Sequence, residues 1–378
     1  MARILGESLD ELRRTRTTLK WRAFPDDVLP AWVAEMDARP CPAVVEAVGS
    51  ALARGDNGYP WSEPFVEAFV GFAARRWGWD VEAERTLVVP DVMIGIEELL
   101  HALTGPAAGV VVSPPCYDSF YGFVESVGRR LVEARLDSDH RLDPEALASA
   151  FAEAGPGSAY ILCNPQNPTG TVHTREELST VARLAADHDV LVVADEIHAP
   201  LVRPGVEFTP YLSVPEAAAG IAVVSASKAF NLAGLKAALA VAGPEAGDAL
   251  GTLHEVVTHG AGHLGVLAQT AAWACGDAWL DQLRAEVRDN RALLTEALAD
   301  ALPEVVVTPA DATYLAWLDC RALGVADPAQ QFLDRGRLAV SAGTRYDRTA
   351  TGWVRLNIGT SPAVVEEAVR RMALAVRN

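Results

Sequence analysis

The sequence predicts an α/β protein with a mostly parallel sheet and a second, smaller α+β domain. Short apolar segments alternate with helical patterns through the middle of the chain, at residues 87–89, 109–113, 159–163, 190–194, 221–225 and 237–241. They are rich in Val, Ile, Leu and Ala without strict alternation, as expected of strands that are buried on both faces. This alternation ends near Cys275. The first part therefore predicts a doubly covered sheet, and the last hundred residues a separate unit.

Local signals place several helices and strands. Thr174-Arg175-Glu176-Glu177 forms a capping box before an apolar-periodic run that reaches His188, which predicts a helix there. After Cys275 we expect a long amphipathic helix over 279–301, strands at 305–308, 313–318, 338–340 and 353–358, and a last helix that begins at Ser361-Pro362. We expect residues 1–40 to pack with the small domain (275–378), and residues 41–274 to form the large domain.

Composition excludes several classes of protein. The formal net charge of −18 disfavours contact with phosphate backbones, so no nucleic-acid partner is expected. No apolar run reaches the roughly 20 residues that cross a bilayer, and the start of the chain lacks the apolar segment of a secretory signal. Five cysteines without paired spacing fit a reducing compartment and no metal site. We therefore expect a cytoplasmic protein.

Polar and turn-forming residues follow five of the six predicted central strands. These segments are 90–95, 114–117, 164–170, 195–198 and 225–228. In open α/β sheets, ligands bind outside the carboxyl ends of the strands. One such segment would mean little, but five of them predict a single crevice.

Together these segments meet the needs of pyridoxal phosphate. Lys228, just past an apolar strand, can form an imine with the cofactor aldehyde. Asp195 can hold the ring nitrogen and Asn167 the phenolic oxygen, while Tyr117 can cover the ring face. The remaining candidates concern the phosphate and the ring oxygen: the backbone N–H groups of Val92 and Met93, the side chains of Ser225, Ser227 and Lys236, and His198 near the cofactor oxygen.

Each residue also has a plainer interpretation. A lone lysine is most often a surface residue, Asp195 can cap a turn, and Asn167 lies in a sequence that strongly favours a turn. Tyr117 can be a core aromatic residue, and His198 an ordinary loop histidine. Arg355 is different, because a charge inside an apolar strand is costly unless it is paired. A substrate carboxylate would pair it by two hydrogen bonds.

The motifs resemble those of fold-type I pyridoxal-phosphate enzymes, the aspartate aminotransferase superfamily. The resemblance rests on Asn167-Pro168-Thr169-Gly170, Asp195-Glu196-Ile197-His198, Ser225-Ala226-Ser227-Lys228 and Arg355, and covers nearly the whole chain. Residues 31–37, 57–60, 228–235 and 313–319 are similar to segments of the MalY/PatB-type cystathionine β-lyases. The resemblance implies a seven-stranded-type sheet with helices on both faces and pyridoxal 5'-phosphate as cofactor.

The resemblance also implies roles for these residues. Lys228 would carry the cofactor and act as the base for the Cα proton, and Arg355 would hold the carboxylate of a small amino-acid substrate. Tyr59 would reach the phosphate and substrate of a neighbouring subunit, in a homodimer with shared active sites. Independently of the resemblance, Trp32, Tyr346, His259 and His263 are candidates to contact a bulky S-substituent, and Arg345 is a candidate to bind a distal carboxylate.

Two segments depart from the family pattern. Residues 343–347 replace a Gly-x-x-Phe-Gly stretch, and residues 258–263 carry His259 and His263; we expect both segments to border the substrate side. The leading hypothesis is C–S β-lysis of cystathionine or other cysteine S-conjugates to thiol, pyruvate and ammonia. The alternatives are an aminotransferase, a decarboxylation-coupled deaminase, or a regulatory protein of the same fold.

Overall fold

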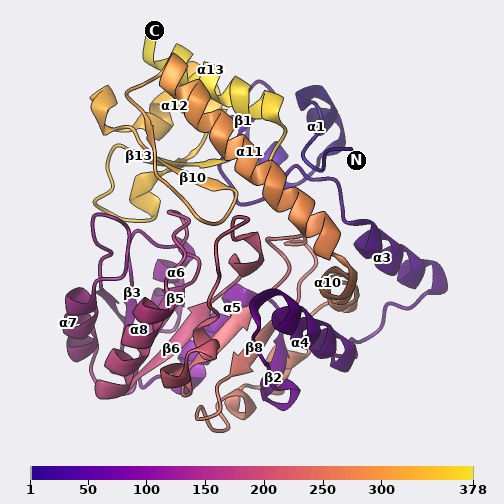
Figure 1. The fold of residues 1–378 in the computed structure, drawn as a ribbon, viewed down its shortest axis with the longest axis vertical. Helices are drawn as coiled ribbons and strands as arrows, with labels where there is room; N and C mark the ends of the chain where they lie inside the picture. Colours follow the sequence, from indigo (N-terminus) through magenta and orange to yellow (C-terminus); the bar gives the residue numbers. More distant parts are fainter. Residues whose placement is uncertain (1, 378) are drawn as a thin grey trace.

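A computed structural model describes residues 2–377. It contains a seven-stranded sheet in the order β2-β8-β7-β6-β5-β3-β4 (Figure 1). Its strands are β2 Thr86–Val89, β3 Gly109–Val112, β4 Arg130–Glu133, β5 Ser158–Cys163, β6 Val190–Asp195, β7 Ile221–Val224 and β8 Ala238–Ala242. Only β8 runs antiparallel to its neighbours, so the predicted mostly parallel sheet is confirmed.

Helices cover both faces of this sheet. The α-helices are α1 Leu9–Thr15, α2 Leu19–Arg22, α3 Pro42–Arg54, α4 Glu63–Trp77, α5 Val92–Leu103, α6 Ser119–Ser126, α7 Pro144–Ala154, α8 Arg175–Asp187, α9 Glu255–Thr258, α10 His263–Cys275, α11 Asp277–Ala301, α12 Pro328–Gly336 and α13 Pro362–Arg377. Helices α5 and α6 pack into one apolar core and α7 and α8 into another, with alternate strand residues pointing into each. The capping box predicted at Thr174 is formed with Glu177.

A four-stranded antiparallel sheet, β12-β13-β10-β9, lies above the first sheet in Figure 1. Its strands are β9 Val306–Val307, β10 Leu315–Asp319, β12 Ser341–Ala342 and β13 Trp353–Asn357. Helix α11 crosses the view from this sheet towards α10, and α13 packs along α11 and α12. The N-terminal segment joins the same region, because β1 (Leu29–Pro30) pairs with β11 (Leu338–Ala339).

Two predicted strands needed correction, and a third strand was missed. The strand expected at 338–340 is divided, because residues 338–339 pair with β1 whereas residues 341–342 pair with β13. The strand expected from Thr313 begins only at Leu315, since Thr313 adopts a left-handed backbone with φ 67°. Strand β4 was missed, because its sequence Arg-Leu-Val-Glu has charged ends typical of an exposed edge.

Among residues 2–377, none of the helices combines the length and the apolar character needed to cross a membrane.

Candidate active site

The predicted strand-end segments meet at the carboxyl edge of the large sheet. Asp195 is the last residue of β6, Asn167 follows β5, and Lys228 lies in the loop between β7 and β8. Arg355 comes from the other sheet, on β13 opposite Trp317 of β10. Its guanidinium reaches across to Asn167, with Nη1 3.1 Å from Oδ1. The structure therefore brings the candidate residues from both sheets to one gap.

The Lys228 amine is partly buried beside the N-terminal segment. Its Nζ donates to the carbonyl oxygen of Ala34 at 3.0 Å. Removal from water lowers the pKa of Lys228 to about 8; the charge of Arg355 acts in the same direction, and Asp195 opposes it. At neutral pH a much larger fraction of this amine is therefore neutral than in an ordinary lysine, and the neutral form can make an imine or accept a proton.

Asp195 is a buried carboxylate. Burial raises its pKa to about 6, against the opposing effects of the backbone N–H of Ile197 and the charge of Lys228. Ile197 donates to Oδ1 at 3.1 Å, and Oδ2 has no hydrogen bond to the described residues. A protonated ring nitrogen would supply the missing partner and favour the ionised carboxylate.

His198 is buried and follows Asp195 by three residues. Burial lowers its pKa to about 3, and the charges of Lys228 and Arg355 act in the same direction. Its Nδ1 is buried and has no partner among the described residues. The ring packs edge-on against Tyr314, with centroids 6.3 Å apart.

Arg355 is a buried cation without a carboxylate partner among residues 2–377. Nη2 donates to the carbonyl of Trp32 at 3.0 Å, and the guanidinium lies over the ring of Tyr346, 4.7 Å from its centroid. Its Nε is buried and makes no hydrogen bond to the described chain. A buried charge in this state is costly until an anion arrives. The site is therefore prepared for a carboxylate.

Lys228 also lines a small pocket. It is lined by Asp91, Val92, Met93, Ile197, Ser227, Lys228, Ala233, Leu235, Lys236 and Ala237. Helix α5 begins at Val92, and its first N–H groups point out of the helix start. Lys236 pairs with Asp91 at 2.5 Å. The helix start, the Ser227 hydroxyl and two lysines make this pocket suitable for a phosphate group.

These observations show that the residues present fit pyridoxal phosphate. Lys228 lines the anion pocket, and its charge acts on the buried carboxylate of Asp195, whose Oδ2 has no hydrogen bond to the described residues. Tyr117 is half-buried beside it, with its hydroxyl 3.5 Å from the Met93 sulfur, and burial raises its pKa. Its position suits a ring that covers one face of the cofactor.

Other predicted residues lie differently. The Ser225 hydroxyl is buried within hydrogen-bonding distance of the Ala237 carbonyl and Gln269 Oε1, at 3.0 and 3.1 Å, and it accepts from Ser227 N. We assign it to bracing the Lys228 loop rather than to the phosphate. The Trp32 ring packs edge-on against Phe24, and only the Trp32 backbone carbonyl meets Arg355.

Tyr59 and Arg345 are exposed. Tyr59 is 92% exposed in this chain and makes no hydrogen bond to the described residues. Arg345 forms an ion pair with Asp118, 2.6 Å apart, next to Tyr117 and Tyr346. Tyr346, within residues 343–347, lies against Arg355, the residue predicted to hold the substrate carboxylate. In residues 258–263, Gly262 N donates to Lys236 O at 2.8 Å, so this segment lies by the pocket that Lys236 lines.

Sequence reasoning missed several residues that hold the site together. They are Ala34, Asn231, Tyr314 and Asn357. Asn231 and Asn357 carried a signal, because each is a polar residue within an apolar stretch close to a predicted catalytic residue. The Ala34 contact left no such signal, because it uses a backbone carbonyl.

The chain belongs to the aminotransferase class I and II family, whose sequence profile matches residues 33–372. A Mycobacterium leprae protein provisionally named cystathionine beta-lyase is 48% identical, over 97% of each chain. Cystathionine beta-lyase PatB of Bacillus subtilis is 35% identical over 93% of each chain. In structure, a protein of Corynebacterium diphtheriae, provisionally described as a PLP-dependent β-cystathionase, has a TM-score of 0.93, 33% identity and 98% coverage of both chains.

Proposed function

We propose that this chain is a pyridoxal-phosphate-dependent C–S β-lyase that acts on cystathionine or other cysteine S-conjugates. The observation that carries the proposal is that one site contains both Lys228 and Arg355. The pKa of Lys228 is lowered to about 8, and Arg355 is a buried guanidinium that lacks a carboxylate partner among the described residues. An amino-acid substrate supplies that carboxylate. The similarity to cystathionine β-lyases over nearly the whole chain supports the choice of reaction.

The residues of the chain divide the work of holding the cofactor. Lys228 would tether the aldehyde, Asp195 the ring nitrogen, and Asn167 and His198 the ring oxygen. Tyr117 would cover the ring. A second group would hold the phosphate: the N–H groups of Val92 and Met93, Ser227 and Lys236. When bound, pyridoxal phosphate takes up the substrate amino group and delocalises the electron pair left at Cα.

Catalysis by the protein then consists of placement and proton transfer. Arg355 binds the substrate carboxylate and so fixes the Cα–H bond relative to the amine of Lys228. Lys228 accepts the Cα proton. The electron pair from that bond forms the Cα–Cβ double bond while the Cβ–S bond breaks, and the leaving sulfur takes a proton. The released enamine takes up one water and yields pyruvate and ammonia.

Product analysis tests this proposal. Holoenzyme incubated with L-cystathionine is expected to give pyruvate and homocysteine in equal amounts. Absence of both products, in a preparation whose absorbance shows bound cofactor, would contradict it. The family name favours aminotransfer as the second candidate. An aminotransferase would convert its cofactor stoichiometrically to the amine form with amino acid alone, whereas a lyase would return to the starting spectrum.

We further infer that the enzyme works as a cytoplasmic homodimer with shared active sites. The exposed Tyr59 lies in the segment before α4, and apolar side chains of Val45, Leu52 and Trp61 are exposed close to it in the sequence. A second copy of the chain would cover them and bring Tyr59 to the partner's phosphate pocket. Light scattering of wild type and of Trp61→Glu tests the dimer.

We also propose that residues 41–274 form the large domain. Residues 275–378 and the N-terminal residues 1–40 would together form the small domain.

A further inference from the structure

The stretch after β1 contacts both the loop that follows β7 and strand β13 of the small sheet. Residues 31–41 form neither helix nor strand, yet Ala34, Met36 and Asp37 are buried. Buried backbone groups without a ladder need other hydrogen-bond partners. We call residues 33–36 the strap, and their hydrogen-bond partners show which parts of the chain hold this segment.

Both cations of the site donate to this stretch of backbone. Lys228 Nζ lies 3.0 Å from the carbonyl oxygen of Ala34, and Arg355 Nη2 lies 3.0 Å from that of Trp32. The two carbonyls are two residues apart along the chain. Tyr314 adds a hydroxyl that donates to Ala34 O at 3.1 Å.

Asn231 clamps the strap from the side of the large sheet. Its Oδ1 accepts from the N–H of Met36 and its Nδ2 donates to the carbonyl of Met36, both at 2.9 Å. Asn231 lies three residues after Lys228, at a left-handed backbone position with φ 57° that asparagine tolerates. The loop that carries Lys228 is thus tied directly to the strap.

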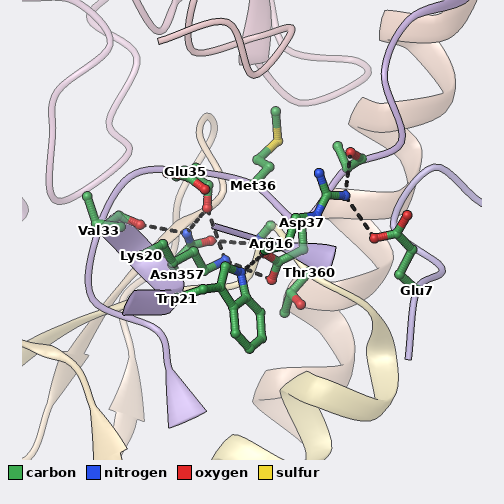
Figure 2. A network of polar contacts seen from close by, with 12 residues as sticks. Glu7, Arg16, Lys20, Trp21, Val33, Glu35, Met36, Asp37, Asn357 and Thr360 are labelled. Carbon is green, nitrogen blue, oxygen red and sulfur yellow. Dashed lines mark hydrogen bonds and ion pairs between the residues drawn. The ribbon is translucent and has the colours of Figure 1, made fainter. Parts of the chain in front are cut away.

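Asn357 clamps the strap from the side of the small sheet. It lies on β13, two residues after Arg355, and its Nδ2 donates to the carbonyls of Val33 and Glu35 at 2.7 and 2.6 Å. Figure 2 shows this amide between the two carbonyls. The strand that carries Arg355 and the loop that carries Lys228 therefore hold the same short segment at alternating residues: Asn357 holds Val33 and Glu35, and Asn231 holds Met36.

A buried ion pair anchors the end of the strap. Lys20 Nζ lies 2.7 Å from Asp37 Oδ2, both side chains are 1% exposed, and Trp21 Nε1 donates to Asp37 Oδ1 at 2.8 Å (Figure 2). Lys20 also donates to the carbonyl of Glu35 at 3.1 Å. Hydrogen bonds from α2, the large-sheet loop and the small sheet thus hold the strap at the same time.

We propose that the strap couples Lys228 to Arg355, and that Asn231 and Asn357 are positioning residues for removal of the substrate Cα proton. The inference rests on the proposed function. Arg355 sets where the substrate carboxylate lies, and Lys228 must reach the Cα proton from the opposite sheet. A rigid connection keeps the two in register, and a misplacement of about 1 Å can cost about 100-fold in rate.

The test is a double-mutant cycle on Asn231→Gly, which keeps the left-handed backbone, and Asn357→Ala. The assay is exchange of the Cα proton of L-cystathionine or S-methyl-L-cysteine in D₂O, followed by NMR, which needs no C–S cleavage. Each single variant is expected to slow exchange about 30-fold. The double variant is expected to exchange the proton only slightly more slowly than the slower of the two single variants. Once one amide has released the strap, loss of the second amide has little further effect.

A second readout does not depend on activity. In the apoprotein, acetylation of Lys228 by an amine-reactive reagent is expected to accelerate several-fold in both single variants, because the amine loses its contact with Ala34. Asn290→Ala is the control: its Nδ2 also joins two buried carbonyls, of Ile358 and Thr360, but does not touch the strap. It is expected to lower stability and leave both rates near those of wild type.

The proposal would be overturned if the loss of exchange rate in the double variant equalled the product of the losses in the two single variants. Acetylation rates that change no more than in Asn290→Ala would also overturn it. A wild-type enzyme that exchanges the Cα proton yet releases no thiol would contradict the lyase function alone, and the cycle would still decide the role of the strap.

Discussion

The two sheets each bring one cationic side chain to the site, and the two cations differ in kind. Lys228, from the large sheet, sits partly buried with its pKa lowered to about 8, so that it can lose and regain a proton. Arg355, from the small sheet, is buried more completely and carries a guanidinium, which keeps its proton in proteins. A cation that titrates is therefore suited to proton transfer, and one that keeps its charge is suited to holding an anion.

Loss of the titrating cation should have the largest effect. We expect Lys228→Ala to lower kcat for pyruvate formation by about 10³-fold or more, since a general base alone contributes about 10²–10⁴-fold. Lys228→Arg keeps a positive charge and should be equally inactive. Substantial activity in the arginine variant would contradict the distinction between the two cations.

Arg355→Lys replaces the permanent anchor by a point charge. We expect kcat/KM to fall by about 100-fold, or about 3 kcal/mol, because a lysine cannot make two parallel hydrogen bonds to a carboxylate. Cofactor absorbance should remain, because the anion pocket does not include Arg355. Steady-state kinetics with L-cystathionine measure the effect, and an unchanged kcat/KM would remove the anchoring role.

The pH dependence of apoprotein stability separates the two cations directly. Lys228 has a folded pKa of about 8 against its ordinary value of 10.5, so the unfolded chain binds its proton more tightly. Its burial therefore destabilises the fold fully below pH 8, and progressively less as the pH rises from 8 to 10.5. Lys228→Met should stabilise the apoprotein in urea at pH 7 and much less at pH 10, whereas the effect of Arg355→Met should not change.

The smallest effect is expected at Arg345, which is exposed. Arg345 is 58% exposed and paired with Asp118, so its contribution is screened by solvent. We expect Arg345→Ala to lower kcat/KM several-fold for conjugates with a carboxylate on the S-substituent, and not at all for S-methyl-L-cysteine. Arg348→Ala, an exposed neighbour without an ion pair among residues 2–377, is the matched control. Equal losses for both substrates would exclude a role in selection.

The sequence was most informative where function depends on side chains at strand ends. Lys228, Asp195 and Asn167 follow apolar strands, and Arg355 interrupts one, so each could be located and the structure brings them together. The strap could not be predicted, because the groups that accept hydrogen bonds from Lys228 and Arg355 are backbone carbonyls. The division of residues 338–342 between two sheets was equally hidden, since pairing partners far along the chain determine it.

The most direct test of the account is to find which lysine carries the cofactor. The chain has only three lysines: Lys20, paired with Asp37; Lys236, paired with Asp91; and Lys228. Borohydride reduction of the holoenzyme fixes the imine, and mass spectrometry of the peptides then locates it. We predict the pyridoxyl phosphate mass on the peptide that contains Lys228 alone. The same mass on Lys20 or Lys236, or on no peptide, would contradict the account.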